Sequence, residues 1–370
     1  SRAMKYIDGF REKDAALWLN RQIAQAGDQL AARGRTVHLM EVCGSHTMAV
    51  SRSGIRETLP SSIRLLSGPG CPVCVTDAGY VDAAIRMAEQ GAIIVTFGDM
   101  VRVPGSHQSL ADVRAQGGDV RICYSPADAL RVAAENPGRE VVFLAIGFET
   151  TAAPVTTLIP SARQADIRNL SLLTAFKRVP PALEALVADE EVQVDGFICP
   201  AHVSAIIGAE AYRPCVEGHH LPCTICGFEP LDILYGIVDL AEQLVSGRAE
   251  LVNQYSRVVR PGGNPAALQL FEKYLTVCDA SWRGIGTIPD SGMAIRGEFV
   301  DMDAARRFGV STEGGRPDPG CRCGDVLKGK IIPPDCPHFG HACTPPHPVG
   351  PCMVSSEGSC AAFYRYGGGR

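Results

Sequence analysis

The chain has 370 residues, 46% hydrophobic and 20% charged, a balance typical of a globular protein and not of a disordered one. This length predicts two or three domains. The net charge of −5 and the lack of a basic run argue against a nucleic-acid partner. No apolar run approaches the ~20 residues that span a membrane, and no export signal opens the sequence, so we expect a cytoplasmic protein.

Short, nearly continuous apolar runs alternate with helical stretches along most of the chain. A helix is predicted first, over residues 11–34, where apolar residues follow helical spacing. The runs that follow read as strands buried on both faces, which predicts parallel sheets with crossover helices. The eight runs cover residues 37–44, 63–70, 92–99, 120–126, 141–148, 170–176, 195–202 and 221–230.

The eight predicted strands look like two sets of four. GSHT at 44–47 and GFET at 147–150 follow the first strand of each set, and a Pro-x-Asp-x-Leu motif at 126–130 and 230–234 follows the fourth. Similar motifs at similar offsets suggest an internal duplication. We therefore predict an α/β fold with two similar lobes, 35–140 and 141–255, each built on a small parallel sheet. A cysteine-rich domain over 256–370 follows, packed with the N-terminal helix 5–34.

Reactive side chains follow the predicted strands at their carboxyl ends, where ligands bind in open parallel sheets. A cleft between the lobes, lined by both sets of loops, is therefore expected. No Gly-x-Gly-x-x-Gly or Walker motif supports nucleotide binding. The residues at these strand ends are Cys43, His46, Cys71, Cys74, Asp99, Glu149, Thr150, Thr151, His202 and Glu229.

Two of these positions carry thiol chemistry. A helix starting after Cys43 would direct its N–H groups toward the thiol and favour a thiolate, which is a nucleophile or a soft metal ligand; a packed cysteine is the alternative. Cys71 and Cys74, in a Cys-x-x-Cys motif, can form a reversible disulfide. A zinc site would need a second pair, such as Cys223 and Cys226, within an apolar strand, and structural cysteines remain a third interpretation.

The last 50 residues hold six of the fifteen cysteines in an irregular segment rich in proline and glycine. A bound metal would supply the folding energy that such a segment lacks. Four thiolates suit a [4Fe–4S] cluster, and zinc stays open because the spacing does not match a compact ferredoxin motif. The six are Cys321, Cys323, Cys336, Cys343, Cys352 and Cys360.

Ten motifs, taken in order, resemble the HypD family of [NiFe]-hydrogenase maturation factors from about residue 6 to 366. They are MEVCGSHT, GPGCPVCV, TFGDMVRVPGS, YSPADAL, GFETT, PAHVSAIIG, GFEPLDIL, NQYSRVV, WRGIGTIP and MVSSEGSCAAFY. The resemblance implies a scaffold that, with the small partner HypC, holds iron while it acquires cyanide and carbon monoxide. It also implies that cyanide comes from HypE and that the Fe(CN)₂CO unit passes toward the hydrogenase large subunit.

The resemblance also assigns residues. Cys43 is the implied iron ligand, with His46 beside it, whereas Met48 stands where the family often has a second histidine. The family spacing C-x12-C-x6-C-x16-C implies Cys323, Cys336, Cys343 and Cys360 as [4Fe–4S] ligands. The pair Cys71 and Cys74 resembles the dithiol of ferredoxin–thioredoxin reductase, which works beside such a cluster.

We therefore predict an assembly scaffold with thiol redox activity rather than a defined enzyme class. Glu149, Thr150 and Thr151 are expected to face the cleft and bind cyanide or the partner, and His202 to brace a loop. The rival hypotheses are a thiol–disulfide oxidoreductase that uses a [4Fe–4S] cluster and a zinc-stabilised interaction module.

Overall fold

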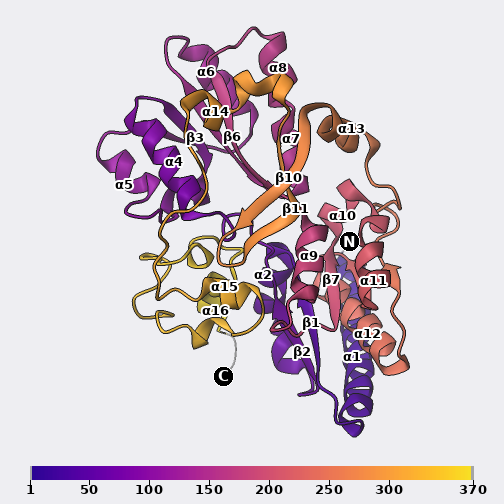
Figure 1. Ribbon diagram of the computed structural model, residues 1–370. Coiled ribbons are helices and arrows are strands. Elements are labelled where there is room, and N and C mark those ends of the chain that lie inside the picture. Colours follow the sequence, from indigo (N-terminus) through magenta and orange to yellow (C-terminus); the bar gives the residue numbers. More distant parts are fainter. Residues whose placement is uncertain (1, 368–370) are drawn as a thin grey trace.

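The computed structural model describes residues 2–367 and contains two separate sheets, each covered by helices (Figure 1). All eight strands predicted from the apolar runs are present, and three more follow them along the chain. No helix in the described residues is long and apolar enough to cross a membrane.

The first sheet has five parallel strands in the order β2-β1-β7-β8-β9. Its central strands are almost fully buried, because valine, leucine, isoleucine and phenylalanine face helices on both sides. The strands are β1 (Val37–Glu41), β2 (Ile63–Ser67), β7 (Gly196–Pro200), β8 (Cys223–Cys226) and β9 (Leu251–Asn253).

The second sheet has six strands in the order β10-β11-β6-β5-β3-β4. Strands β6, β5, β3 and β4 are parallel, and the hairpin β10–β11 adds to β6 in antiparallel fashion through β11. The strands are β3 (Ile93–Phe97), β4 (Val120–Cys123), β5 (Val141–Gly147), β6 (Leu170–Lys177), β10 (Leu275–Trp282) and β11 (Gly286–Ile295).

The sheets do not follow the predicted division at residues 140 and 255. Each sheet takes two strands from the range 35–140 and two or more from 141–255, and the hairpin of the predicted third domain completes the second sheet. Sequential strands need not share a sheet, because helical crossovers are long enough to carry the chain between sheets. The two sheets nevertheless share one strand order. Strands β2, β1, β7 and β8 of the first sheet correspond to β6, β5, β3 and β4 of the second, and each strand is four positions from its counterpart along the chain.

Helices follow most strands, as the alternating pattern predicts, and α1 packs along α12 (Figure 1). Those around the first sheet are α1 (Arg2–Ala32), α2 (Gly44–Ser53), α3 (Ile55–Thr58), α9 (Val179–Ala188), α10 (Ala201–Ile207), η2 (Ala209–Tyr212), α11 (Arg213–His219) and α12 (Pro230–Ser246). Those nearer the second are α4 (Ala78–Glu89), η1 (Gly98–Arg102), α5 (Leu110–Ala115), α6 (Ala127–Glu135), α7 (Glu149–Thr156), α8 (Leu158–Gln164), α13 (Pro265–Tyr274), η3 (Gly297–Met302) and α14 (Ala304–Phe308).

The cysteine-rich segment is largely irregular, as expected, and lies beside α2 (yellow in Figure 1). Its short helices are α15 (Cys323–Leu327), η4 (Pro333–Asp335), η5 (Pro351–Met353) and α16 (Ser359–Tyr366). One hydrophobic cluster contains the dithiol motif together with residues of this segment, including Cys323 and Leu327. The segment is therefore packed against the same core that supports the candidate cysteines.

Candidate functional site

Cys43 lies between β1 and α2, where it is the N-cap residue of the helix with an extended backbone. The buried Glu41 side chain fixes this turn, since its carboxylate accepts a hydrogen bond from the Cys43 backbone N–H at 3.3 Å and from the Thr47 hydroxyl at 2.6 Å. Glu41 is fully buried, and burial raises the pKa of its carboxyl. Cys43 is thus held by a hydrogen-bonded strand-to-helix turn.

The loop that carries the dithiol motif packs directly on Cys43. Gly44 N–H donates to the Gly70 carbonyl at 3.1 Å, and a Cβ atom on Gly70 would lie 2.4 Å from the Cys43 backbone nitrogen. Only glycine fits at position 70, because backbone meets backbone there. The residue before Cys71 therefore touches Cys43, which brings these two predicted site cysteines together.

Cys71 and Cys74 form a disulfide with a Cα–Cα distance of 5.2 Å, and both are buried. The Cys74 backbone N–H points at the Cys71 sulfur at 3.2 Å. Such an N–H stabilises negative charge on the first sulfur when the pair is reduced. The two cysteines of the motif are thus close enough to be joined, as a reversible disulfide requires.

His46 lies in the first turn of α2 and is fully buried. Its Nε2 donates to the Gly227 carbonyl at 2.9 Å and lies 3.8 Å from the Cys226 sulfur. Burial lowers the pKa of His46 to about 4, so the imidazole is neutral. Because Nε2 carries the proton, the buried Nδ1 has a free lone pair and no hydrogen-bond partner in the described residues.

Phe228 connects the two histidines of the predicted site. Its ring centroid lies 4.4 Å from that of His46 and 4.4 Å from that of His202. His202, at the start of α10, is therefore part of an aromatic stack, in keeping with its expected supporting position.

The Cys43 thiol differs from expectation in its ionisation. The backbone N–H groups of Ser45 and His46 lower its pKa, as predicted for a helix start, yet burial outweighs them and raises the pKa to about 11. The negative charges of Glu41 and Glu357 contribute to this increase. Desolvation exceeds the effect of the helix end here.

Glu149 begins α7 at the end of β5 and is 2% exposed. Its carboxylate accepts the Val179 backbone N–H at 3.1 Å and 3.3 Å, and burial raises its pKa to about 7. Thr150 and Thr151 follow on α7, which packs against α10. The helices that cover the two sheets thus meet here, although no hydrogen bond joins Glu149 to Cys43 or His46 among the described residues.

The last two strand-end residues have different surroundings. Asp99 accepts a hydrogen bond from the Ser355 hydroxyl at 3.2 Å and so connects the second sheet to the cysteine-rich segment. Glu229 is the N-cap residue of α12, with its backbone N–H bonded to Asp232 at 3.1 Å. Its position indicates capping of α12.

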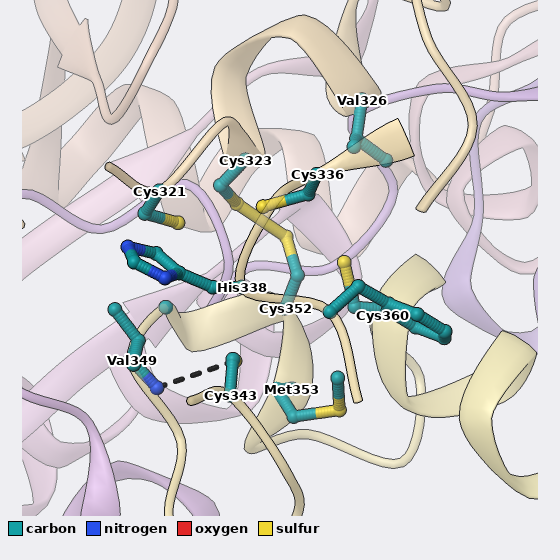
Figure 2. A pocket seen from close by; sticks show the side chains of 12 residues that line it. Cys321, Cys323, Val326, Cys336, His338, Cys343, Val349, Cys352, Met353 and Cys360 are labelled. Carbon is teal, nitrogen blue, oxygen red and sulfur yellow. Dashed lines mark hydrogen bonds between the residues drawn. A yellow bond between two sulfur atoms is a disulfide. The ribbon is translucent and has the colours of Figure 1, made fainter. Parts of the chain in front are cut away.

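All six C-terminal cysteines line one pocket, together with His338, Phe339 and Met353 (Figure 2). The sulfur atoms of Cys321, Cys336 and Cys360 point toward the same space in this view. Burial raises the pKa of Cys360, and the charges of Cys321, Cys343 and Cys336 raise it further, which shows that the four thiols lie within electrostatic range.

One predicted ligand is paired with another cysteine in this pocket. Cys323 forms a disulfide with Cys352, whereas Cys321, Cys336, Cys343 and Cys360 are free (Figure 2). Cys321 and Cys323 are only two residues apart, so spacing alone could not distinguish them. The free thiols do not yet converge on a point, since no group of three or more ligating side chains among the described residues is close enough to hold one metal ion.

Several residues of the site were not predicted. Cys226 ends β8 next to His46, and its neighbour Gly227 supplies the carbonyl that fixes the imidazole. Glu357 covers the start of α2, where a Cβ atom on Gly44 would lie 2.4 Å from the Glu357 Cβ. Gly227 and Glu357 lie in the motifs GFEP and SSEG, and Cys226 directly precedes GFEP, so the unusual composition of these motifs was the available signal.

These features define a two-sheet α/β protein whose strand-end cysteine, disulfide and cysteine pocket share one region. Residues 19–367 match the family model described as "HypD: Hydrogenase formation hypA family". The chain is 45% identical to "Hydrogenase maturation factor HypD" of Azotobacter vinelandii, over 98% of this chain and 97% of that protein. It is 39% identical to the Escherichia coli K12 protein of the same name, over 98% of both chains.

The match covers nearly the whole chain, and the chain belongs to the HypD family. The resemblance drawn from the sequence motifs is confirmed.

Proposed function

We propose that this protein is a cytoplasmic hydrogenase maturation factor that holds iron at Cys43 during assembly of the Fe(CN)₂CO group. HypC would share the iron, HypE would supply cyanide, and the hydrogenase large subunit would receive the product. The observation that carries the proposal is the packing of the Cys71–Cys74 loop on Cys43, next to a neutral His46 with a free Nδ1. A soft thiolate suits iron with strong-field ligands, and iron binding would displace the thiol proton.

The dithiol gives the site a two-electron reductant. A thiocyanate on a partner needs two electrons to release cyanide: RSCN plus the reduced Cys71 and Cys74 gives RSH, HCN and the disulfide. Atoms and electrons balance with one dithiol per cyanide. The structure holds the pair in the oxidised form, so a donor must reduce it before each transfer.

The cysteine pocket suits a [4Fe–4S] cluster by its donor chemistry, since four free thiols lie within electrostatic range in a buried setting. We propose Cys321, Cys336, Cys343 and Cys360 as its ligands, in place of the set that includes Cys323. When bound, the cluster would supply single electrons. Cys323 and Cys352 then form a second redox-capable pair that lies in the same hydrophobic cluster as Cys71 and Cys74.

The decisive experiment is anaerobic purification with HypC and HypE, followed by infrared spectroscopy. Bands from iron-bound cyanide and CO are expected in the wild-type complex and should disappear in Cys43→Ala. Cys278→Ala, which changes a half-buried cysteine on β10, is the control and should keep them. Unchanged bands in Cys43→Ala would refute the iron assignment and favour a thiol–disulfide oxidoreductase.

The ligand set is tested separately. With the cluster reconstituted, Cys321→Ser should lose most of the brown absorption, whereas Cys323→Ser should retain it. The opposite pattern would restore the set that includes Cys323.

A further inference from the structure

An open cavity of about 670 Å³ lies between the loop that follows η1 and the cysteine-rich segment. Its size falls in the range of small-molecule sites, ~300–1,000 Å³. Three arginines and two histidines line it. They are Arg102, Arg283, Arg316, His107 and His347.

None of the three guanidinium groups is matched by a close carboxylate in the described part of the chain. Arg102 donates to the carbonyls of Pro345 at 2.7 Å and Val354 at 3.2 Å. Arg283 donates only to backbone carbonyls, at 3.3 Å and 3.4 Å. Arg316 donates its backbone N–H to the Ser106 hydroxyl oxygen at 2.7 Å, and its exposed guanidinium is available to a ligand.

Arg283 is the strongest sign of a built site, because it is only 6% exposed and lines the cavity. Burial lowers its pKa, while more distant charges on Cys321, Asp77 and Asp82 partly compensate. A buried cation that lacks a close counter-ion is costly, and a bound anion would relieve that cost.

The two carboxylates that line the cavity are already engaged. Asp112 accepts hydrogen bonds from the Ser109 N–H and hydroxyl, and Asp318 accepts one from the Gly320 N–H. Asp318 also lies 3.5 Å from His338. Neither forms an ion pair with an arginine of the cavity in the described residues, and three arginines against two carboxylates leave the lining with a formal charge of +1, with the histidines counted as neutral.

We propose that this cavity binds a small multivalent oxyanion, either a phosphate group or a polycarboxylate. Guanidinium groups bind both in a bidentate manner. The bound anion would join Arg102, in η1 after β3, to Arg316, which lies just before the cysteine-rich segment. Because Val349 lines both this cavity and the cysteine pocket, occupancy would also stabilise the packing of that pocket.

Thermal unfolding and titration calorimetry of the full chain test the proposal with inorganic phosphate and citrate, each against sodium chloride at equal ionic strength. We expect saturable binding of at least one oxyanion and a dissociation constant at least tenfold higher in Arg316→Gln. Arg257→Gln, which changes an exposed arginine outside the cavity, should bind as the wild type does. Binding of phosphate or of citrate tells whether the ligand is a phosphate group or a polycarboxylate.

Two results would overturn the proposal. One is stabilisation by both oxyanions that is no greater than by chloride. The other is an equal loss of affinity in Arg316→Gln and Arg257→Gln, which would indicate non-specific screening. Neither result bears on iron binding at Cys43, so the two proposals fail independently.

Discussion

Replacing Glu149 by glutamine should stabilise the protein at high pH and change little at low pH. The side chain is buried, and its raised pKa of about 7 compares with an ordinary value of 4.5. Since the folded pKa is the higher one, the stability that this group contributes is full below pH 4.5 and is lost as the pH rises through 7. At about 1.36 kcal/mol per pKa unit, the loss is roughly 3 kcal/mol.

Glutamine keeps an oxygen that can accept the Val179 N–H but never ionises. Urea unfolding is therefore expected to show Glu149→Gln more stable than the wild type by about 3 kcal/mol at pH 8, and by less than about 1 kcal/mol at pH 5. The exposed Glu190→Gln is the control and should show no such change with pH. An equal difference in stability at both pH values would refute the reasoning. If Glu149→Gln supports full hydrogenase maturation, the negative charge of Glu149 is not needed for the proposed function.

Two further predictions concern burial and close packing. Lys177 is 4% exposed, and burial lowers its pKa to about 8. In urea unfolding, Lys177→Met should therefore raise the free energy of unfolding by roughly 3 kcal/mol at pH 7 and by less than about 1 kcal/mol at pH 10. An unchanged gain at pH 10 would contradict this. Gly70→Ala should lower the midpoint of thermal unfolding by several degrees, because the new Cβ atom would clash with the Cys43 backbone. The control is Gly138→Ala, whose Cβ atom would have no neighbour within 4 Å and should leave the midpoint unchanged. Equal effects of the two substitutions would show that the loop can move away.

The sequence predicted the strands well and their distribution poorly. Runs such as 141–148 are apolar enough to be strands wherever they pair, and each lies where expected. Pairing between β1 and β7 depends on contacts more than 150 residues apart, which no local pattern records.

The site was predicted in the same uneven way. Cys43, His46 and the dithiol follow strands whose ends are set by local sequence, so their proximity could be expected. The ionisation of Cys43 depends on the burial supplied by distant segments, including Glu357. The choice between Cys321 and Cys323 depends on which sulfur reaches Cys352, and spacing does not determine this.

The exchange of strands between the sheets has a consequence for how the chain folds during synthesis. After β1 and β2 leave the ribosome, about 130 residues must follow before β7 arrives to complete the centre of their sheet. The second sheet can assemble its four parallel strands first, since they are contiguous along the chain. Until then, the strand that positions Cys43 has an unpaired edge, which makes the nascent protein a candidate for chaperone binding.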